Sequence, residues 1–265
     1  MSNLRCELVL PDVHVPYEDK KALRAIHHYI KWKNNPKSKQ VPITGLTQVG
    51  DLLDLEAVSR HNKGKRGLQE GLRVADEFAA GYKLLRLWRD LLGDDAKITL
   101  VEGNHEYRIK AYLDEFPELV GSISVPDGLR LAELGVKWVP YWSDHSKVHK
   151  VGKLSIGHGY KTSKFHAGTH VDEYGCNFMY GHTHAIQSFS RAIVGKGKII
   201  AADSIGCLVD LGRPWTHGRP DKWEHAFVVL YVQPNGMFQK YIVRVHNGRF
   251  TSPEGVRFSY KGMEK

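Results

Sequence analysis

The sequence predicts an α/β fold whose core is formed by two β-sheets flanked by helices. In the first two-thirds of the chain, short apolar strand-like runs alternate with helix-like segments, and the last third is rich in strands. Alternating strands and helices indicate parallel strands joined by crossover helices, whereas strands joined by short turns indicate antiparallel pairing. A β-rich end after such alternation therefore favours two sheets with helices on their outer faces.

Short apolar runs mark the strands of the first two-thirds. They are Glu7 to Leu10, the segment ITGLTQV ahead of Gly50, Ile98 to Val101, Leu154 to Ile156, and Asn177 to Tyr180. Helix-like segments alternate with them. These are Glu18 to Lys33, Leu68 to Leu92 and Glu106 to Phe116, and the second has the clearest apolar stripe.

The last third contains three further strand-like runs, KIIAADS, HAFVVLYV and FQKYIVRV. The segment Gln-Pro-Asn-Gly joins the last two runs, and Asn-Gly between two alternating runs is a strong hairpin signal. We therefore expect antiparallel strands in this part of the chain.

The composition excludes several classes of protein. With 265 residues, of which 42% are hydrophobic and 25% charged, the chain has the values of a globular domain. No apolar run reaches the length of a membrane span and the first residues lack the layout of a signal peptide, so we expect one cytoplasmic domain over residues 1–265. Three cysteines without CxxC spacing indicate neither a disulfide framework nor a thiolate metal site. The net charge of +9 favours a polyanionic partner such as nucleic acid.

Five polar clusters each come directly after one of the apolar strands. They are Asp12-Val13-His14, Gly50 to Asp54, Gly103 to Glu106, Gly157 to Gly159, and Gly181 to His184. The carboxyl ends of parallel strands are where α/β folds bind ligands, and the glycines before four of the clusters allow sharp turns. Side chains at positions i and i+2 of an extended segment point the same way. Asp12 with His14, and His182 with His184, are therefore each expected to present two ligands to one point.

Together the clusters offer seven oxygen and nitrogen donors and no thiolate. The donors are Asp12, His14, Asp51, Asn104, His158, His182 and His184. One ion rarely needs so many ligands, whereas two ions that share a bridging carboxylate do. Two ions roughly 3.5–4 Å apart clamp both oxygens of a displacement at phosphorus and lower the pKa of a bridging water. Imidazole mixed with carboxylate favours Mn, Fe, Zn, Co or Ni over Mg or Ca, and we expect two divalent ions, with Mn²⁺ as the first choice.

Each cluster alone has an ordinary structural explanation. Asp12 could occupy a turn, Asn104 could cap the helix that follows it, and His158 could be a hydrogen-bonded core histidine. Together these explanations require five independent coincidences, each behind a strand-like run. A common metal site explains all five clusters at once.

The motifs DVH, GDLLD, GNHE, an isolated GH and GHTH occur in this order from Asp12 to His184. This set resembles the five motifs of the calcineurin-like metallophosphoesterase superfamily and covers about two-thirds of the chain. The resemblance implies a four-layer α/β/β/α sandwich with two mixed β-sheets flanked by helices. It also implies hydrolysis of a phosphate ester by a metal-bridging hydroxide.

The resemblance further implies a role for each motif residue. The first metal would be held by Asp12, His14, Asp51 and His184. The second would be held by Asp51, Asn104, His158 and His182, so that Asp51 bridges the two ions. The catalytic residues would be His105, as proton donor to the leaving oxygen or stabiliser of the transition state, and Asp54, which would orient His105 by accepting its other N–H.

The residues after GDLLD bear on the substrate. Phosphoserine/threonine phosphatases of this superfamily continue with Arg-Gly, whereas Leu55 and Glu56 follow here, which argues against a phosphoprotein substrate. Basic residues near the motifs are expected to bind substrate phosphates, with a solvated basic surface as the alternative. They include Arg60, His61 and Arg108, and further along the chain Lys161, Lys164, Arg191, Arg213 and Arg219. Aromatic residues could stack on bases or simply pack in the core. They are Tyr107, Tyr141, Trp142, Trp215 and Trp223.

The segments DVHVPY and GDLLDLEAVSR and the Trp-rich end are similar to phosphoesterases encoded by bacteriophages, and more distantly the chain resembles the nuclease domain of Mre11/SbcD-type exonucleases. This resemblance implies a phosphodiesterase with nucleic acid, above all DNA, as substrate, acting in the host cytoplasm if phage-encoded. Two other functions stay open. One is a phosphomonoesterase or a small-molecule or cyclic-nucleotide phosphodiesterase, and the other is a non-catalytic scaffold, against which the presence of His105 and Asp54 argues.

Overall fold

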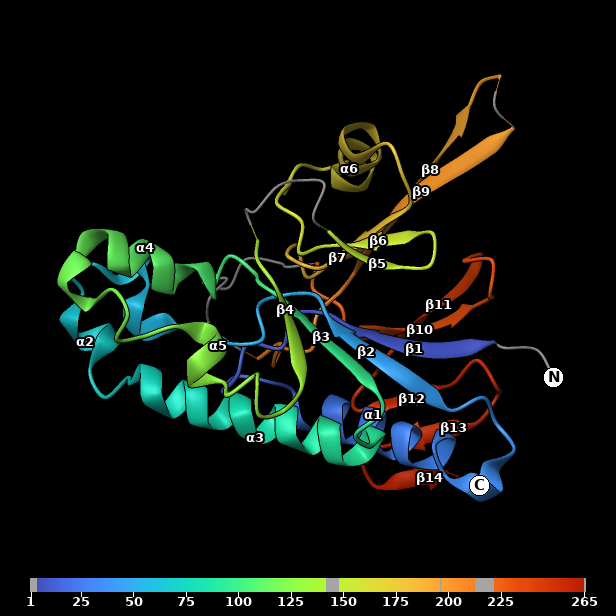
Figure 1. Ribbon diagram of the computed structural model, residues 1–265, viewed down its shortest axis with the longest axis horizontal. Helices are drawn as coiled ribbons and strands as arrows, with labels where there is room; N and C mark the ends of the chain where they lie inside the picture. Colours follow the sequence, from blue (N-terminus) through green and yellow to red (C-terminus); the bar gives the residue numbers. More distant parts are fainter. Residues whose placement is uncertain (1–3, 142–147, 196, 213–221, 265) are drawn as a thin grey trace.

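The computed structural model describes residues 4–141, 148–195, 197–212 and 222–264. Its largest element is a six-stranded sheet with strand order β11-β10-β1-β2-β3-β4 (Figure 1). These strands are β1 (Arg5–Leu10), β2 (Ile43–Gln48), β3 (Lys97–Val101), β4 (Val136–Val139), β10 (Ala226–Val232) and β11 (Phe238–Arg244). Strands β1 to β4 run parallel, and β10 pairs antiparallel with both β1 and β11. The carboxyl ends of four parallel strands therefore lie at one edge of this sheet.

A second, five-stranded sheet has the order β5-β6-β7-β9-β8. Its strands are β5 (His149–Val151), β6 (Leu154–Ile156), β7 (Phe178–Tyr180), β8 (Ile186–Ile193) and β9 (Lys198–Ile205). The neighbours β6, β7 and β9 are parallel, whereas β5 and β8 are antiparallel to theirs. The fold is thus mixed α/β with two large mixed sheets, as expected from the sequence.

Helices pack against both sheets. The helices are α1 (Lys20–Lys33), α2 (Arg66–Gln69), α3 (Val74–Leu92), α4 (Tyr107–Glu115), α5 (Val125–Gly128) and α6 (His166–Tyr174), with 3₁₀ turns at Pro36–Ser38, Glu56–Val58, Arg60–Asn62 and Pro117–Leu119. The largest buried cluster joins α1 and α3 to one face of the six-stranded sheet, with the fully buried Trp88 and Tyr29 among its largest members. In Figure 1, α6 lies on the side of the five-stranded sheet that faces away from the six-stranded sheet.

Apolar side chains join the two sheets over only part of their width. The buried cluster between them takes Val9 from β1 and Val228 and Leu230 from β10, and packs them against Ile156 and Met179 of the second sheet. A third cluster joins β7 and β9 to Val171 of α6. The face that β2, β3 and β4 turn toward the second sheet carries polar residues instead, among them Thr47, Thr99 and Lys137.

Several sequence predictions of elements are confirmed and one helix prediction is wrong. The hairpin at Gln-Pro-Asn-Gly is present as the antiparallel pair β10–β11. The helix expected over Leu68 to Leu92 is broken, because Gly71 adopts a φ of 77° between α2 and α3. The run KIIAADS forms β9, which pairs antiparallel with β8 as expected, but it lies in the five-stranded sheet and is parallel to its other neighbour, β7. A strand's partner depends on distant parts of the chain, so its local pattern alone does not reveal the sheet it joins.

A small third sheet, of strands β12 (Arg249–Thr251), β13 (Arg257–Ser259) and β14 (Gly262–Glu264), covers α1. A buried polar contact fixes it in place. The ammonium group of Lys33, whose side chain is fully buried, donates to Glu254 Oε1 at 2.6 Å and to the Tyr231 hydroxyl at 2.8 Å. This contact ties α1 and β10 to the segment between β12 and β13. Within the described residues, the helices are all too short or too polar to cross a membrane.

Substituting Glu254→Ala should lower the free energy of unfolding by roughly 3–5 kcal/mol, because it leaves the buried ammonium of Lys33 without its carboxylate. Denaturant unfolding followed by circular dichroism measures the loss. The matched control is Glu264→Ala, which removes a 3.6 Å contact with an exposed Arg249 and should cost less than about 1 kcal/mol. Equal losses in the two variants would contradict a stabilising role for the buried pair.

Candidate metal centre

Strands from both sheets deliver the predicted donors to one place. Asp12 follows β1, Asp51 follows β2 and Asn104 follows β3, all at the carboxyl edge of the six-stranded sheet. His14 also follows β1, whereas the other three histidines come from the second sheet, where His158 follows β6 and His182 and His184 follow β7. Contacts between these side chains show that the seven donors form one cluster. The structure thus brings together all seven residues that the sequence predicts as donors.

The local geometry of the donor turns differs from the prediction. His14, Asp51, His182 and His184 have positive φ angles of 53°, 53°, 67° and 58°, so these residues are in the left-handed region and not extended. The backbone is therefore not extended as assumed, yet Asp12 and His14 do meet in one donor group, whereas His182 and His184 lie in different groups. Each left-handed non-glycine residue costs roughly 1–3 kcal/mol and persists only when its surroundings hold it. Such strain is commonly found at functional sites.

One group of donors consists of Asp12, His14 and His184, all buried, with ligand atoms within 4.8 Å of one another. His14 Nε2 lies 3.0 Å from His184 Nε2, which lies 3.6 Å from Asp12 Oδ1. Burial and the neighbouring His105 lower the pKa of His14 to about 4, so its ring is neutral near pH 7. His14 Nδ1 donates to Asp54 Oδ1 at 3.0 Å, which leaves the Nε2 lone pair directed at this group.

A second group consists of Asp51, His158 and His182, again within 4.8 Å. His158 Nδ1 donates to the carbonyl of Val49 at 2.9 Å, which turns Nε2 toward Asp51 Oδ2 at 3.3 Å. Asn104 Oδ1 completes the group, at 2.9 Å from His158 Nε2 and 2.8 Å from His182 Nδ1. A backbone acceptor on one ring nitrogen that directs the other nitrogen into the site is the usual second contact of a metal-binding histidine.

The Asp51 carboxylate lies between the two groups. Its Oδ2 is 3.3 Å from His158 Nε2 in one group and 3.8 Å from His14 Nε2 in the other. Its Oδ1 accepts the backbone N–H of His105 at 2.8 Å. One carboxylate oxygen thus faces ring nitrogens of both groups, which is the position that a bridging ligand requires.

The charges of the cluster favour a cation. Burial alone would raise the pKa of Asp51, but His158 and His105 hold it well below its usual value, and the same balance of burial against His184 and His158 lowers the pKa of Asp12. Burial would lower the pKa of His158, yet the charge of Asp51 raises it to about 9. Two buried carboxylates therefore stay anionic and attract positive charge between the rings. Imidazole, carboxylate and amide donors without thiolate fit a divalent ion, so these buried groups could hold one.

Asp54, His105 and Arg108 form a hydrogen-bonded set beside the donors. His105 Nδ1 lies 2.8 Å from the Asp54 carbonyl oxygen and 3.2 Å from Asp54 Oδ1, while Arg108 donates to His105 Nε2 at 3.0 Å. Burial would raise the pKa of Asp54, but its hydrogen bonds with His105 and His14 lower it. Burial would likewise lower the pKa of His105, which the Asp51 and Asp54 carboxylates raise. The Asp54 carboxylate thus contacts both His14 and His105.

One residue without an assigned role in the sequence argument turns out to support the site. Glu106 is fully buried, and its carboxylate accepts the backbone N–H groups of Asp51, Leu53 and Gly103 at 2.8–2.9 Å. Burial raises the pKa of Glu106 to about 7, while three amide donors favour its ionised form. It joins the turn after β2 to the turn after β3. Its position at the end of the GNHE motif, directly after a strand, is the feature of the sequence from which this role could have been predicted.

Two glycines leave room for the carboxylates. A Cβ at Gly181 would lie 2.0 Å from Asp12 Oδ2, and a Cβ at Gly103 would lie 2.1 Å from Asp51 Oδ1. Both distances are far inside van der Waals contact, so any side chain there would displace a carboxylate. The glycines of GHTH and GNHE are thus required for space at the carboxylates.

The predicted substrate-binding residues divide into two sets. Arg108 joins the cluster, whereas Arg60 donates to the carbonyl of Ala111 in α4 at 2.8 Å and His61 is exposed. Within the described part of the chain, Arg60 and His61 make no hydrogen bond or ion pair with the donors. Of the aromatic residues, Tyr141 lies edge-on to His158 and Trp223 edge-on to His184. The predictions of base stacking by Trp142 and Trp215 and of phosphate binding by Arg213 and Arg219 concern residues outside the described part of the chain.

A cavity of about 640 Å³ opens beside the donors and includes His182 in its lining. Its walls come from the segment before α6, the segment after β7 and the segment before β10. They contain Lys164, Lys222 and Trp223. A cavity with lysines and a tryptophan in its walls therefore adjoins the candidate metal centre.

Substituting Gly181→Ala should abolish stable metal uptake, because the new methyl group would collide with the carboxylate of Asp12. Elemental analysis of the purified protein measures the bound metal. Gly168→Ala is the matched control, since its Cβ would meet Phe189 no closer than 3.7 Å within helix α6. The control should keep its metal and gain a few tenths to 1 kcal/mol of stability. Full metal content in the Gly181 variant would contradict the role assigned to Asp12.

No family model matches the sequence. Over 256 residues the chain is 24% identical to the Gene 54 protein of Mycobacterium phage L5, an overlap of 92% of this chain and 95% of the phage protein. Among solved structures, the crystal structure of Chaetomium thermophilum Vps29 matches 91% of this chain and 92% of its own at a TM-score of 0.45 and 14% identity. The expected similarity to a bacteriophage protein is therefore confirmed, and it extends over nearly the whole chain. The name of that relative states no activity.

Proposed function

We propose that the chain is a calcineurin-like metallophosphoesterase that hydrolyses phosphodiester bonds of nucleic acid, with DNA as the preferred substrate. The observation that carries the proposal is the Asp51 carboxylate, whose Oδ2 lies 3.3–3.8 Å from ring nitrogens of both donor groups. The proposal includes the finer fold, a four-layer α/β/β/α sandwich in one domain, which the packing of α1 and α3 on one sheet and α6 on the other supports.

The proposed centre holds two divalent ions, with Mn²⁺ as the first choice. One would be bound by Asp12, His14, Asp51 and His184, and the other by Asp51, Asn104, His158 and His182. When bound, such a pair neutralises charge on the phosphoryl group and makes hydroxide available near neutral pH. The chain's own contribution is to hold the carboxylates ionised and the rings oriented, through Val49, Asp54 and Glu106.

His105 is the proposed proton donor to the leaving oxygen. Its Nδ1 is held by Asp54, which fixes the ring and keeps Nε2 on the side of Asp51 Oδ2, 3.8 Å away. Arg108 contacts the same Nε2 and carries a second guanidinium nitrogen bonded to the Asp54 carbonyl. A phosphate that entered here would take over the Arg108 hydrogen bond from Nε2, which frees Nε2 to carry the proton that it donates. Arg108 would then supply the phosphate contact for which other branches of the superfamily use Arg-Gly.

Three features support nucleic acid as the substrate. The chain carries a net charge of +9, which attracts a polyanion. The cavity beside His182 contains Lys164 and Lys222, which suit the phosphates next to the bond being cleaved. It also contains Trp223, an aromatic surface on which a base can stack.

With Mn²⁺, the purified protein should cleave DNA oligonucleotides and bis-p-nitrophenyl phosphate in preference to p-nitrophenyl phosphate. Cleavage of the oligonucleotides should slow steeply as salt rises, because phosphate contacts release counterions. Turnover of bis-p-nitrophenyl phosphate, which lacks flanking phosphates, should depend little on salt. Efficient turnover of the monoester with no cleavage of any nucleic acid would reject the substrate proposed here and favour the phosphomonoesterase.

Metal stoichiometry tests the bridging role directly. His184→Ala and His182→Ala should each weaken one of two metal sites, whereas Asp51→Ala should weaken both. Elemental analysis after dialysis against a fixed Mn²⁺ concentration measures the content per chain. His246→Ala, an exposed histidine outside the cluster, should keep the full content. A single bound ion in the unmodified protein, or an Asp51 variant that keeps two, would contradict the proposal.

Substituting His105→Ala should lower kcat by about 10²- to 10⁴-fold with the metal content unchanged, since a positioned general acid contributes that much. The loss should be smallest for a substrate with a good leaving group, such as the nitrophenyl diester, because its departure needs little help from a proton. A uniform loss across leaving groups would instead assign His105 to charge stabilisation. Unchanged turnover of all substrates would remove it from the catalytic machinery.

A further inference from the structure

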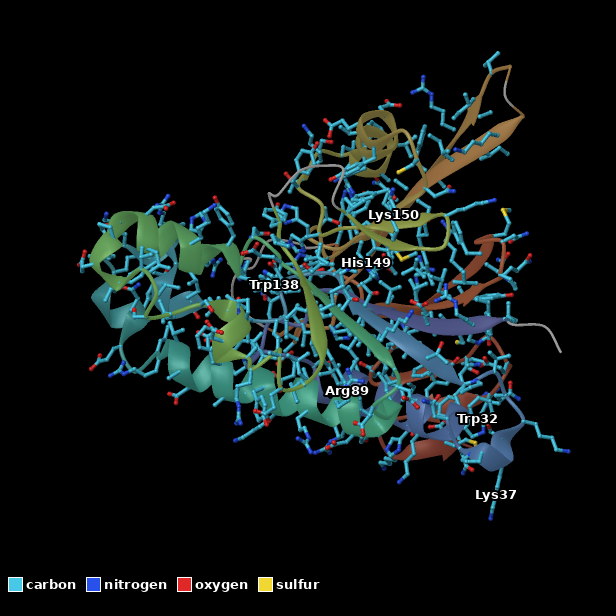
Figure 2. The ribbon with its side chains drawn as sticks, in the orientation of Figure 1. Trp32, Lys37, Arg89, Trp138, His149 and Lys150 are labelled. Carbon is cyan, nitrogen blue, oxygen red and sulfur yellow. The ribbon has the colours of Figure 1, made fainter. Side chains whose placement is uncertain are left out.

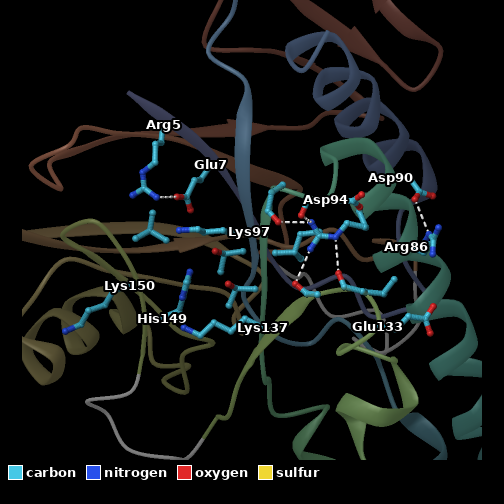
Figure 3. A pocket seen from close by; sticks show the side chains of 18 residues that line it. Arg5, Glu7, Arg86, Asp90, Asp94, Lys97, Glu133, Lys137, His149 and Lys150 are labelled. Carbon is cyan, nitrogen blue, oxygen red and sulfur yellow. Dashed lines mark hydrogen bonds and ion pairs between the residues drawn. The ribbon is translucent and has the colours of Figure 1, made fainter. Parts of the chain in front are cut away.

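A second cavity, of about 650 Å³, lies at the opposite ends of the strands that carry the metal donors (Figure 3). Lys97 begins β3 and Lys137 lies in β4, whereas Asn104 follows the other end of β3. The floor is the polar face that β1 to β4 turn toward the second sheet, and His149 of β5 lies across from it. Figure 2 shows His149 in the region between the two sheets.

Strand alternation explains why this space is polar. On β3, Lys97 and Thr99 share one face, and Thr99 is in register with Lys137 of β4. Residues of the opposite face, such as Ile98, pack into the core beneath α3. The apolar contact between the sheets is confined to β1, β10 and the residues near them. Beyond β2 the side chains on this face are polar instead, and those of Lys97 and Lys137 are exposed.

Two lysines and a histidine in this cavity lack partners among the described residues. The ammonium groups of Lys97 and Lys137 are exposed and make no hydrogen bond or ion pair within that part of the chain, although the charge of Lys97 acts on the Glu7 carboxylate. His149 Nδ1 is buried and also without a hydrogen-bond partner there. In Figure 3 these three side chains extend from three strands into the same part of the cavity. A buried polar atom without a partner costs free energy, which a ligand can recover.

Several other charged groups of the cavity have partners, whereas the exposed Asp94 carboxylate makes no ion pair within the described residues. Glu7 pairs with Arg5 at 3.2 Å, and Arg86 pairs with Asp90 at 3.1 Å. Arg89 directs its guanidinium at five backbone carbonyls, among them those of Leu134 and Gly135. Lys150 follows His149 and points away from the lysine pair (Figure 3). Among the described residues, the charged lining groups without an ion pair or hydrogen bond are therefore Lys97, Lys137 and Lys150 against Asp94, so the unpaired charge of the cavity is positive on balance.

We propose that this cavity is a second binding site, distinct from the metal centre, for a small phosphorylated anion. Lys97 and Lys137 would bind the phosphoryl oxygens, and the Nδ1–H of His149 would donate to the same anion. Burial and the nearby Lys137 lower the pKa of His149 to about 4, so its ring is neutral and Nδ1 can donate as one tautomer. The volume suits a ligand from the size of pyrophosphate to that of a nucleotide.

Calorimetric titration of the full chain with inorganic pyrophosphate tests the proposal. EDTA is present throughout, so that binding at a loaded metal centre does not contribute. We expect one pyrophosphate per chain, and about tenfold weaker binding for each of Lys97→Ala and Lys137→Ala. His149→Leu should also weaken it, because it removes the Nδ1 donor. Adenosine diphosphate in a parallel titration distinguishes a nucleotide from a free oligophosphate.

The matched control is the double variant Lys31→Ala/Lys83→Ala, which removes two exposed helical lysines and the same charge as Lys97→Ala/Lys137→Ala. It should bind pyrophosphate within twofold of the unmodified chain. Thermal unfolding of the variants shows whether each remains folded. Absence of pyrophosphate uptake, or equal weakening in the two double variants, would overturn the proposal. Because metal is excluded, either result leaves the proposed phosphoesterase activity untouched.

Discussion

The position of the Asp51 carboxylate between two groups of buried imidazoles is the constraint on which the rest of the site depends. An anion so deeply buried is tolerated only with positive charge nearby, and His158 and His105 provide part of it. The same carboxylate holds the backbone N–H of His105 and so links the donors to the proposed proton donor. A change in the turn after β2 therefore alters both donor groups and His105 together.

Backbone strain and packing hold this arrangement. Four of the donor residues adopt left-handed φ angles, and each needs contacts that exclude the relaxed conformation. Glu106 provides such contacts from within the core, because its two oxygens accept amide groups from the turns after β2 and β3. The backbone N–H of His182 donates to Asp12, so the turn after β7 is fixed by a donor from the other sheet. The site is thus assembled from two sheets that restrain each other.

The two ends of the parallel strands differ in the same physical terms. At the carboxyl ends, turns bring carboxylate and imidazole groups together, and these groups favour a bound cation. At the amino ends, the ammonium groups of Lys97 and Lys137 favour a bound anion. The two sheets meet through apolar side chains near β1 and β10 but through polar ones beyond β2, because β2 to β4 place threonine and lysine on that face. A metal centre and an anion cavity can therefore occupy opposite ends of one sheet without sharing a residue.

The sequence by itself determined the strands that carry the donors, the α1 helix, the β10–β11 hairpin and the identity of the residues that converge at Asp51, because strand periodicity and the turns after strands are local properties. Tertiary structure decided the rest. The pairing of β9 with β7, the left-handed turns at His14 and His182, and the buried carboxylate of Glu106 all depend on contacts between residues far apart in the chain. So does the separation of Arg60 from the donors, since its guanidinium is taken by a carbonyl of α4. Local patterns reveal which groups a chain offers, whereas only packing decides which of them meet.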